Sequence, residues 1–203
     1  MLTIGILIFD DAEELDFVGP YEVFTMSNEM ARQAGHEDLQ RVLLIAERKG
    51  LVTCNKKMRV EATHSLDEAP DLDVLLVPGG QGTRREMENH RLIEWISNAA
   101  PRCQWVTSVC TGSLVLGAAG LTRGKRVTTH WAVISLLRET GFAGEVLEKV
   151  RYVRDGNLVT SAGVSAGIDM ALWLVGQLHG PDHARLVQRG MEYDPAPPYA
   201  ALV

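Results

Sequence analysis

The sequence predicts an α/β fold built on a mostly parallel, doubly wound sheet. Short apolar runs alternate with segments of helical periodicity along the 203 residues. Strands that are apolar throughout are buried on both faces, which requires helices above and below the sheet. One such strand also runs into Cys110 and turns directly into a helix. The length, and the lack of repeats or a linker, indicate a single domain over residues 1–203.

The first elements follow this alternation. Residues 3–9 form a continuous apolar run, and the sequence after them predicts a helix over residues 16–32 that opens near Gly19-Pro20, since proline is favoured in a first helical turn. Short apolar runs then predict strands at residues 42–46 and 73–77. Residues 57–61 indicate a hairpin or an edge strand.

The middle of the chain contains the predicted nucleophile turn. A helix is expected over residues 84–100, because Leu92, Ile96 and Ala99 share one face. A strand at residues 105–108 and a helix at residues 111–120 follow, and Gly120 ends the helix.

The last part repeats the pattern and ends in a proline-rich tail. Asp155-Gly156-Asn157 is a strong hairpin turn between two apolar runs. The tail is expected to be an extended arm packed on a surface. The remaining segments are strands at residues 127–129, 149–153 and 158–161, helices at 132–140, 165–178 and 182–192, and the tail at 194–199.

Composition excludes several classes of function. The net charge of −6 and the lack of a lysine or arginine run argue against nucleic acid and membrane partners. Only eleven residues follow Glu192 in this sequence, so we expect no DNA-binding helix-turn-helix after it unless the chain is a fragment. Three cysteines without a Cys-x-x-Cys motif predict neither a disulfide framework nor a zinc site. With no basic leader, we expect a cytoplasmic protein that acts on a small molecule.

Cys110 has the setting of a nucleophile on an elbow between a strand and a helix. Ser108 and Gly112 are small, as a very tight turn requires, and the helix amino terminus behind the sulfur favours a thiolate. The alternative is a buried cysteine that serves as a small hydrophobe.

The loop Pro78-Gly79-Gly80-Gln81-Gly82 follows a predicted strand directly. Its glycines would let backbone N–H groups face inward as a nest for negative charge. A plain turn is the alternative. Neither of the two glycine-rich nucleotide-binding motifs is present.

Asp16 differs from the other acids of the first loop because it lies between Leu15 and Phe17, where an apolar helix face begins. Shielding from water would raise the pKa of its carboxyl group and suit it to proton transfer near the cysteine. A helix-capping role is equally compatible with the sequence.

His130 is expected at the carboxyl edge of the sheet, where ligands bind in folds of this kind. It would either orient a substrate or form part of the pocket wall with Trp131. The other histidines lack metal-ligand spacing, so no metal is expected.

Five motifs together resemble the DJ-1/PfpI superfamily. They are Leu15-Asp16-Phe17-Val18-Gly19-Pro20, Val77-Pro78-Gly79-Gly80, Ser108-Val109-Cys110-Thr111-Gly112-Ser113, Lys125-Arg126-Val127-Thr128-Thr129-His130-Trp131 and Arg154-Asp155-Gly156-Asn157-Leu158-Val159-Thr160. The resemblance implies a flavodoxin-like α/β sandwich, of the class I glutamine amidotransferase type, with a cysteine elbow. It also implies a homodimer.

The stretch from Ser108 to Leu121 and the ending Glu192–Pro198 are most similar to the branch of this superfamily that hydrates isocyanides. That likeness implies Cys110 as nucleophile, Asp16 as its acid/base partner and Thr111 in the pocket. Gly79, Gly80, Val164 and His130 would complete the site. Thr111 replaces the histidine of the protease-like branch, which argues against peptide hydrolysis.

The implied reaction is hydration of an isocyanide to an N-substituted formamide through a cysteine thioimidate, with no cofactor. Aspartate where the DJ-1 branch has glutamate argues against a deglycase or a chaperone, and a glyoxalase- or deglycase-like stress protein is kept as an alternative. The sequence is also compatible with a ligand-sensing domain related to AraC-type regulators, and with a redox sensor whose cysteine is oxidised.

Overall fold

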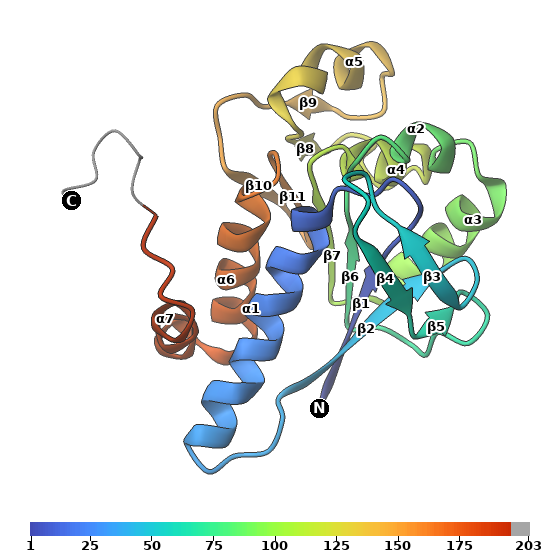
Figure 1. Cartoon of the computed structure of the whole chain (residues 1–203). Helices are drawn as coiled ribbons and strands as arrows, with labels where there is room; N and C mark the ends of the chain where they lie inside the picture. Colours follow the sequence, from blue (N-terminus) through green and yellow to red (C-terminus); the bar gives the residue numbers. More distant parts are fainter. Residues whose placement is uncertain (196–203) are drawn as a thin grey trace.

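The computed structural model describes residues 1–195 and shows helices on both faces of a central sheet (Figure 1). Within these residues seven strands form the sheet in the order β10-β11-β7-β6-β1-β2-β5. All neighbouring strands are parallel except β10, which pairs antiparallel with β11 at one edge. This arrangement confirms the predicted α/β class. The strands are β1 (Leu2–Leu7), β2 (Gln40–Ala46), β5 (His64–Ser65), β6 (Val74–Val77), β7 (Trp105–Val109), β10 (Tyr152–Asp155) and β11 (Leu158–Ser161).

The apolar runs form strands because both of their faces are covered. Every residue of β6, β7 and β11 is buried. Along β1, Ile4 and Ile6 pack in one apolar cluster, while Leu7 belongs to a second cluster. The core therefore consists of two layers, separated by the sheet.

Long helices cover one face of the sheet. α1 (Glu14–Gln33), α6 (Ala166–His179) and α7 (Pro181–Gly190) pack against one another and supply Phe24 and Leu174 to the first cluster (Figure 1). Shorter helices supply Ile96, Leu114 and Leu137 to the second cluster. These are α3 (His90–Ala99), α4 (Gly112–Ala118) and α5 (Ile134–Glu139).

The helix predicted over residues 84–100 is two helices. α2 (Thr83–Glu86) ends before Asn89, whose side chain accepts a hydrogen bond from the N–H of Leu92 and caps α3. A short 3₁₀ helix, η1 (Ala100–Arg102), follows α3. The break matters because it lets α2 turn toward the carboxyl edge of the sheet, where the candidate site lies.

The strand predicted at residues 127–129 does not join the main sheet. β8 (Arg126–Val127) pairs with β9 (Glu145–Val146) in a separate two-stranded sheet, and the Thr128 N–H donates to Oγ1 of Thr160 at 2.8 Å. The Thr160 side chain thus accepts the hydrogen bond that the Thr128 N–H would otherwise donate to a neighbouring strand. Another short 3₁₀ helix, η2 (Trp131–Val133), precedes α5.

Two other local predictions have different outcomes. The hairpin expected around residues 57–61 exists, with β3 (Gly50–Thr53) antiparallel to β4 (Arg59–Ala62). α1, by contrast, begins at Glu14 and contains Pro20 in its interior, so Pro20 does not open the helix.

In the part of the chain that the structure describes, no helix combines the length and apolar character needed to span a bilayer. The arm predicted at residues 194–199 lies outside the described residues from 196 onward.

Candidate active site

Cys110 lies on a strained turn between β7 and α4. Its φ angle is +55°, a left-handed conformation that side-chain-bearing residues adopt only when the surroundings impose it. Its N–H donates to the carbonyl oxygens of Ser161 at 3.2 Å and Ala162 at 2.9 Å. Gly112 must be small, because a Cβ there would lie 2.2 Å from the Val77 carbonyl oxygen. The local geometry is that of a nucleophile elbow.

Asp16 lies in the first turn of α1 and is fully buried. Its Oδ2 atom accepts a hydrogen bond from the Gly79 N–H at 2.9 Å. Its Oδ1 atom is also buried, with no hydrogen-bond partner among the described residues. No side chain caps the start of α1, so the alternative role of Asp16 as a cap is not what the structure shows.

Burial sets the protonation of the Asp16 carboxyl group. It raises the pKa from 3.8 to about 7, while the hydrogen bonds from Gly79 and the Cys110 side chain oppose that rise. The group therefore exchanges its proton in the range where an acid/base catalyst works best.

The pKa of the Cys110 thiol is raised as well. Burial and the negative charge of Asp16 raise the pKa of Cys110 to about 12, against the lowering effect of hydrogen bonds from Thr111 and Val164. The helix amino terminus alone predicted a thiolate at Cys110, and that prediction is wrong for a thiol buried beside Asp16. A carboxylate beside a thiol in a dry site leaves one proton shared between them above pH 7.

The glycine loop after β6 fixes the side chains of Asp16 and Thr111 through hydrogen bonds from its backbone. The Gly80 N–H donates to Oγ1 of Thr111 at 3.0 Å, as the Gly79 N–H does to Asp16. A Cβ on Gly79 would lie 2.6 to 2.8 Å from the Thr111 N, the Thr111 Oγ1 and the Asp16 Oδ2. Both N–H groups of the predicted nest thus bind side chains of the site in this structure.

A pocket of about 200 Å³ opens beside Cys110. It brings together five of the residues selected from the sequence, namely Gly80, Cys110, Thr111, His130 and Val164. Asp16 and Gly79 do not line it but contact Cys110 and Thr111 from the buried side. The pocket residues that the sequence did not indicate are Glu13, Asn55, Gln81, Arg84, Ala132 and Val133.

Two pocket residues are held by their backbone surroundings. Val164 has a φ of +44°, an outlier for a β-branched residue, and its N–H hydrogen-bonds to Cys110. The His130 ring packs against Gly163, where a Cβ would come within 2.2 Å of Cδ2. Nδ1 of His130 accepts a hydrogen bond from the Ala132 N–H at 3.3 Å.

Two aromatic side chains near the site, Phe17 and Trp131, lie outside the Cys110 pocket. Phe17 is 1% exposed and belongs to the core, so it does not line the pocket. Trp131 is 82% exposed and lines a neighbouring groove of about 600 Å³, which shares His130 and Val164 with the pocket.

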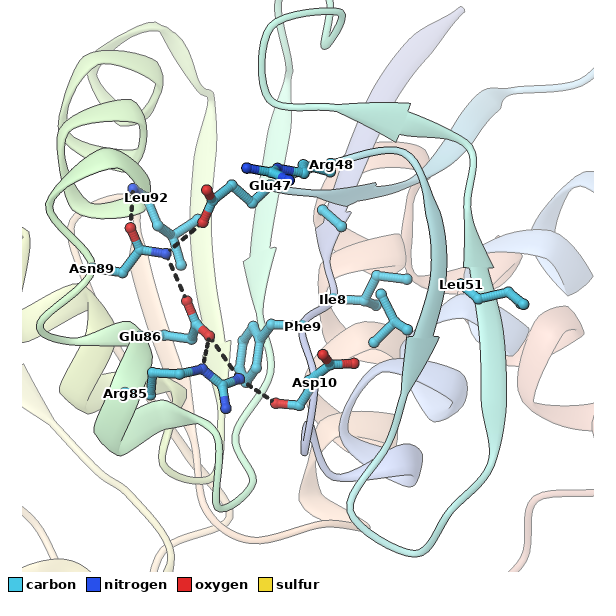
Figure 2. A pocket seen from close by; sticks show the side chains of 12 residues that line it. Ile8, Phe9, Asp10, Glu47, Arg48, Leu51, Arg85, Glu86, Asn89 and Leu92 are labelled. Carbon is cyan, nitrogen blue, oxygen red and sulfur yellow. Dashed lines mark hydrogen bonds and ion pairs between the residues drawn. The ribbon is translucent and has the colours of Figure 1, made fainter.

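A separate pocket of about 360 Å³ lies beyond α2, at the ends of β1 and β2. Figure 2 shows an apolar wall with Ile8 and Phe9 and a chain of polar groups through Arg85, Glu86 and Asn89. No cysteine, serine, threonine or histidine lines it. Of these two pockets, only the first is lined by a cysteine.

Comparison with known proteins is consistent with this site. The model of the DJ-1/PfpI family matches residues 3–177. An isonitrile hydratase from Pseudomonas putida is 45% identical over 198 residues, which cover 98% of this chain and 81% of that protein.

Two further relatives are less similar in sequence. The HTH-type transcriptional regulator CdhR of Pseudomonas aeruginosa is 31% identical over 84% of this chain, which matches only 48% of the regulator. A crystal structure of a ThiJ/PfpI family protein from Pseudomonas syringae superposes with a TM-score of 0.87 at 33% identity, covering 98% of this chain and 78% of that one. The chain belongs to the DJ-1/PfpI family.

Proposed function

We propose that this protein hydrates isocyanides to N-substituted formamides, with Cys110 as nucleophile and Asp16 as acid/base group. The observation that carries the proposal is the pairing of a cysteine on a strained elbow with a buried carboxyl group whose pKa is about 7. The similarity to an isonitrile hydratase over nearly the whole chain supports the same reaction.

The substrate explains why a carboxyl group suits this site. The terminal carbon of an isocyanide, R–N≡C, accepts both a nucleophile and a proton. Cys110 forms the S–C bond while Asp16 takes the thiol proton and passes it to the same carbon, which gives the thioimidate R–N=CH–S–Cys. The carboxyl group thus ends the step in the protonation state in which it began.

Water completes the reaction. Asp16 removes a proton from the water as the water oxygen bonds to the thioimidate carbon, and it passes that proton to the nitrogen, which gives R–NH–CH(OH)–S–Cys. The C–S bond then breaks, R–NH–CHO leaves, and the thiol regains its proton. The sum is R–NC plus water giving R–NHCHO. The described residues 1–195 bring no three His, Cys, Asp or Glu side chains together for a metal, and none of these steps requires one.

Hydrogen bonds around the sulfur support its two roles. The N–H groups of Thr111 and Val164 and the Thr111 hydroxyl lower the pKa of Cys110. They therefore stabilise negative charge on the sulfur both when it attacks and when it leaves.

The proposal is tested by incubating the purified chain with a panel of alkyl and aryl isocyanides and, separately, with 2-oxoaldehydes. Formamide is followed by proton NMR. We expect formamide from isocyanides and no hydroxyacid from the 2-oxoaldehydes; the reverse pattern would assign a glyoxalase instead.

A redox-sensing role makes a different prediction. A sensor cysteine is readily oxidised when it is exposed as a thiolate, whereas Cys110 is 7% exposed and its thiol pKa is raised. Mass spectrometry after mild peroxide treatment should show little sulfinic acid at Cys110 under conditions where isocyanide turnover is complete.

We also infer a homodimer. Leu15, Val18 and Tyr21 recur on one face of α1, and each is 37% exposed despite its apolar character. Light scattering coupled to size exclusion should give twice the chain mass of 22.3 kDa. A monomer mass at working concentration would contradict this.

A further inference from the structure

Thr83, the first residue of α2, lies within hydrogen-bond distance of the hydroxyl group beside the proposed nucleophile. Its side chain is fully buried. Its Oγ1 atom lies 2.8 Å from the Gly80 carbonyl oxygen and 3.1 Å from Oγ1 of Thr111. Thr111 in turn hydrogen-bonds to Cys110 through its side chain. Thr83 does not line the Cys110 pocket and therefore does not touch a substrate there.

Thr83 and Thr111 each have one hydroxyl proton, so the hydrogen bond that one of them donates limits the choices of the other. Oγ1 of Thr111 already accepts the Gly80 N–H at 3.0 Å, and it lies 3.2 Å from the Gly80 carbonyl oxygen. Its single proton can go to that carbonyl, to Oγ1 of Thr83 or to the Cys110 sulfur, but to only one of them at a time. Whichever group satisfies the Gly80 carbonyl decides where the Thr111 proton points.

Thr83 is the better donor to that carbonyl. Its hydroxyl contact of 2.8 Å is shorter than the 3.2 Å contact from Thr111 and the two 3.3 Å contacts, from Nη1 of Arg84 and from the Thr83 N–H itself. Nη1 of Arg84 also donates to Oγ1 of Thr83 at 3.2 Å, which occupies a lone pair and leaves the Thr83 proton free to donate.

The other side of α2 is anchored as well. Nη2 of Arg85 donates to the Asp10 carbonyl oxygen at 2.7 Å, and Arg85 pairs with Glu86. Glu86 accepts from Asn89, which also donates to Glu47 at 2.7 Å (Figure 2). These contacts fix the short helix α2 to the segments that follow β1 and β2. They thereby fix the position of the Thr83 hydroxyl at the start of that helix.

We propose that Thr83 is a positioning residue for catalysis: by satisfying the Gly80 carbonyl, it leaves the Thr111 hydroxyl proton to the Cys110 sulfur. This inference rests on the proposed role of Cys110 as nucleophile. Loss of the Thr83 hydroxyl would leave the Gly80 carbonyl with only two long N–H contacts of 3.3 Å, from the backbone of residue 83 and from Nη1 of Arg84. The Thr111 hydroxyl, at 3.2 Å, would then turn its proton to this carbonyl, and the sulfur would lose a donor.

The test is the rate at which iodoacetamide alkylates Cys110, measured by mass spectrometry of the Cys110 peptide as a function of pH. This readout needs no isocyanide, so it separates failure of this inference from failure of the proposed reaction. Thr83→Val should slow alkylation at a fixed pH by about tenfold, which corresponds to about 1.4 kcal/mol, and shift its pH midpoint upward. Thr83→Ser keeps the hydroxyl and should restore the wild-type profile.

A double-mutant cycle identifies the route of the effect. Because Thr83 is argued to act through Thr111, Thr83→Val should add nothing to Thr111→Val, and the double variant should match Thr111→Val alone. Additive losses, or a wild-type alkylation profile in Thr83→Val, would overturn the inference. Thr83→Ala provides the same comparison if the valine variant does not fold.

A matched control separates positioning from general stability. Thr122→Val removes an equally buried hydroxyl that donates to the Phe142 carbonyl oxygen at 2.9 Å, and Thr122 lies outside the Cys110 pocket. It should lower the melting temperature while keeping the Cys110 alkylation midpoint. In isocyanide turnover, Thr83→Val should lower kcat with little change in KM, since Thr83 contacts no part of the pocket. A shifted alkylation midpoint in Thr122→Val equal to that of Thr83→Val would contradict the positioning role.

Discussion

The backbone N–H of Gly79 donates to Oδ2 of Asp16 at 2.9 Å and thereby joins the loop after β6 to the first turn of α1. The bond brings an acid from one end of the sequence close to Cys110, the proposed nucleophile, in the middle of it. It satisfies Oδ2, whereas Oδ1 is buried without a hydrogen-bond partner among the described residues.

The buried Asp16 carboxyl group should destabilise the fold at neutral pH. Its pKa is raised from 3.8 to about 7, so the folded state binds the proton more tightly than the unfolded state between these values. Stability therefore falls as pH rises from about 4 to 7, by about 4 kcal/mol at most, and is level above that range. Asp16→Asn removes the charge, and urea unfolding at pH 8 should show it to be more stable than wild type although inactive. A less stable variant would contradict this.

The pH dependence of turnover should report the same group. The pair must lose one proton before Cys110 can attack, so kcat/KM for an isocyanide should rise with pH to a plateau, with a midpoint near 7. Steady-state rates between pH 5 and 9 measure this. A rate that is still rising tenfold per pH unit at pH 9 would mean that the thiol ionises without help from Asp16.

Gly79→Ala should displace the side chains of the candidate site from their positions around Cys110. The added methyl group would collide with Thr111 and Asp16, and both must shift to admit it. We expect a loss of turnover on the order of 100-fold, because small misplacements of reacting groups have effects of that size. Gly176→Ala is the matched control, since its Cβ would meet nothing closer than 3.6 Å. Equal activities of the two variants would contradict the close approach at Gly79.

The two histidines near the far end of α1 should make the fold sensitive to acid. His179 hydrogen-bonds to Gln40 at 2.7 Å, His183 hydrogen-bonds to Ser27 at 2.8 Å, and burial lowers the pKa of both rings. The unfolded chain then binds more protons below about pH 6.5, so stability falls as pH drops through that range.

This effect opposes that of Asp16 and is best measured in the Asp16→Asn background. Melting temperatures from pH 7.5 to 5 should fall in that background. They should fall much less when His179→Gln and His183→Gln are added. An unchanged slope would show that other groups cause the loss.

The elements carrying the nucleophile and its partner could be predicted because their signals are local. Small residues on both sides of Cys110 indicate a tight turn, and Asp16 stands out as an acid within an apolar helix face. Continuous apolar strands predict burial on both faces, and the sheet order agrees with that prediction.

What the sequence did not predict depends on contacts between distant segments. The division of residues 84–100 into α2 and α3 depends on Asn89, which bonds to Glu47 across the fold as well as to its own helix. The N–H of Thr128 goes to the Thr160 side chain, which keeps β8 out of the main sheet. The raised thiol pKa of Cys110 reflects burial beside a carboxylate 94 positions earlier in the chain, which no local pattern reports.

The role of Cys110 is tested most directly by formamide production from an aryl isocyanide in Cys110→Ala, with Cys103→Ala as the matched control. Both cysteines are buried, and Cys103 lies apart from the pocket beside Cys110. Covalent catalysis by Cys110 predicts no formamide above the uncatalysed rate from Cys110→Ala, and wild-type turnover from Cys103→Ala. Wild-type turnover by Cys110→Ala would contradict it.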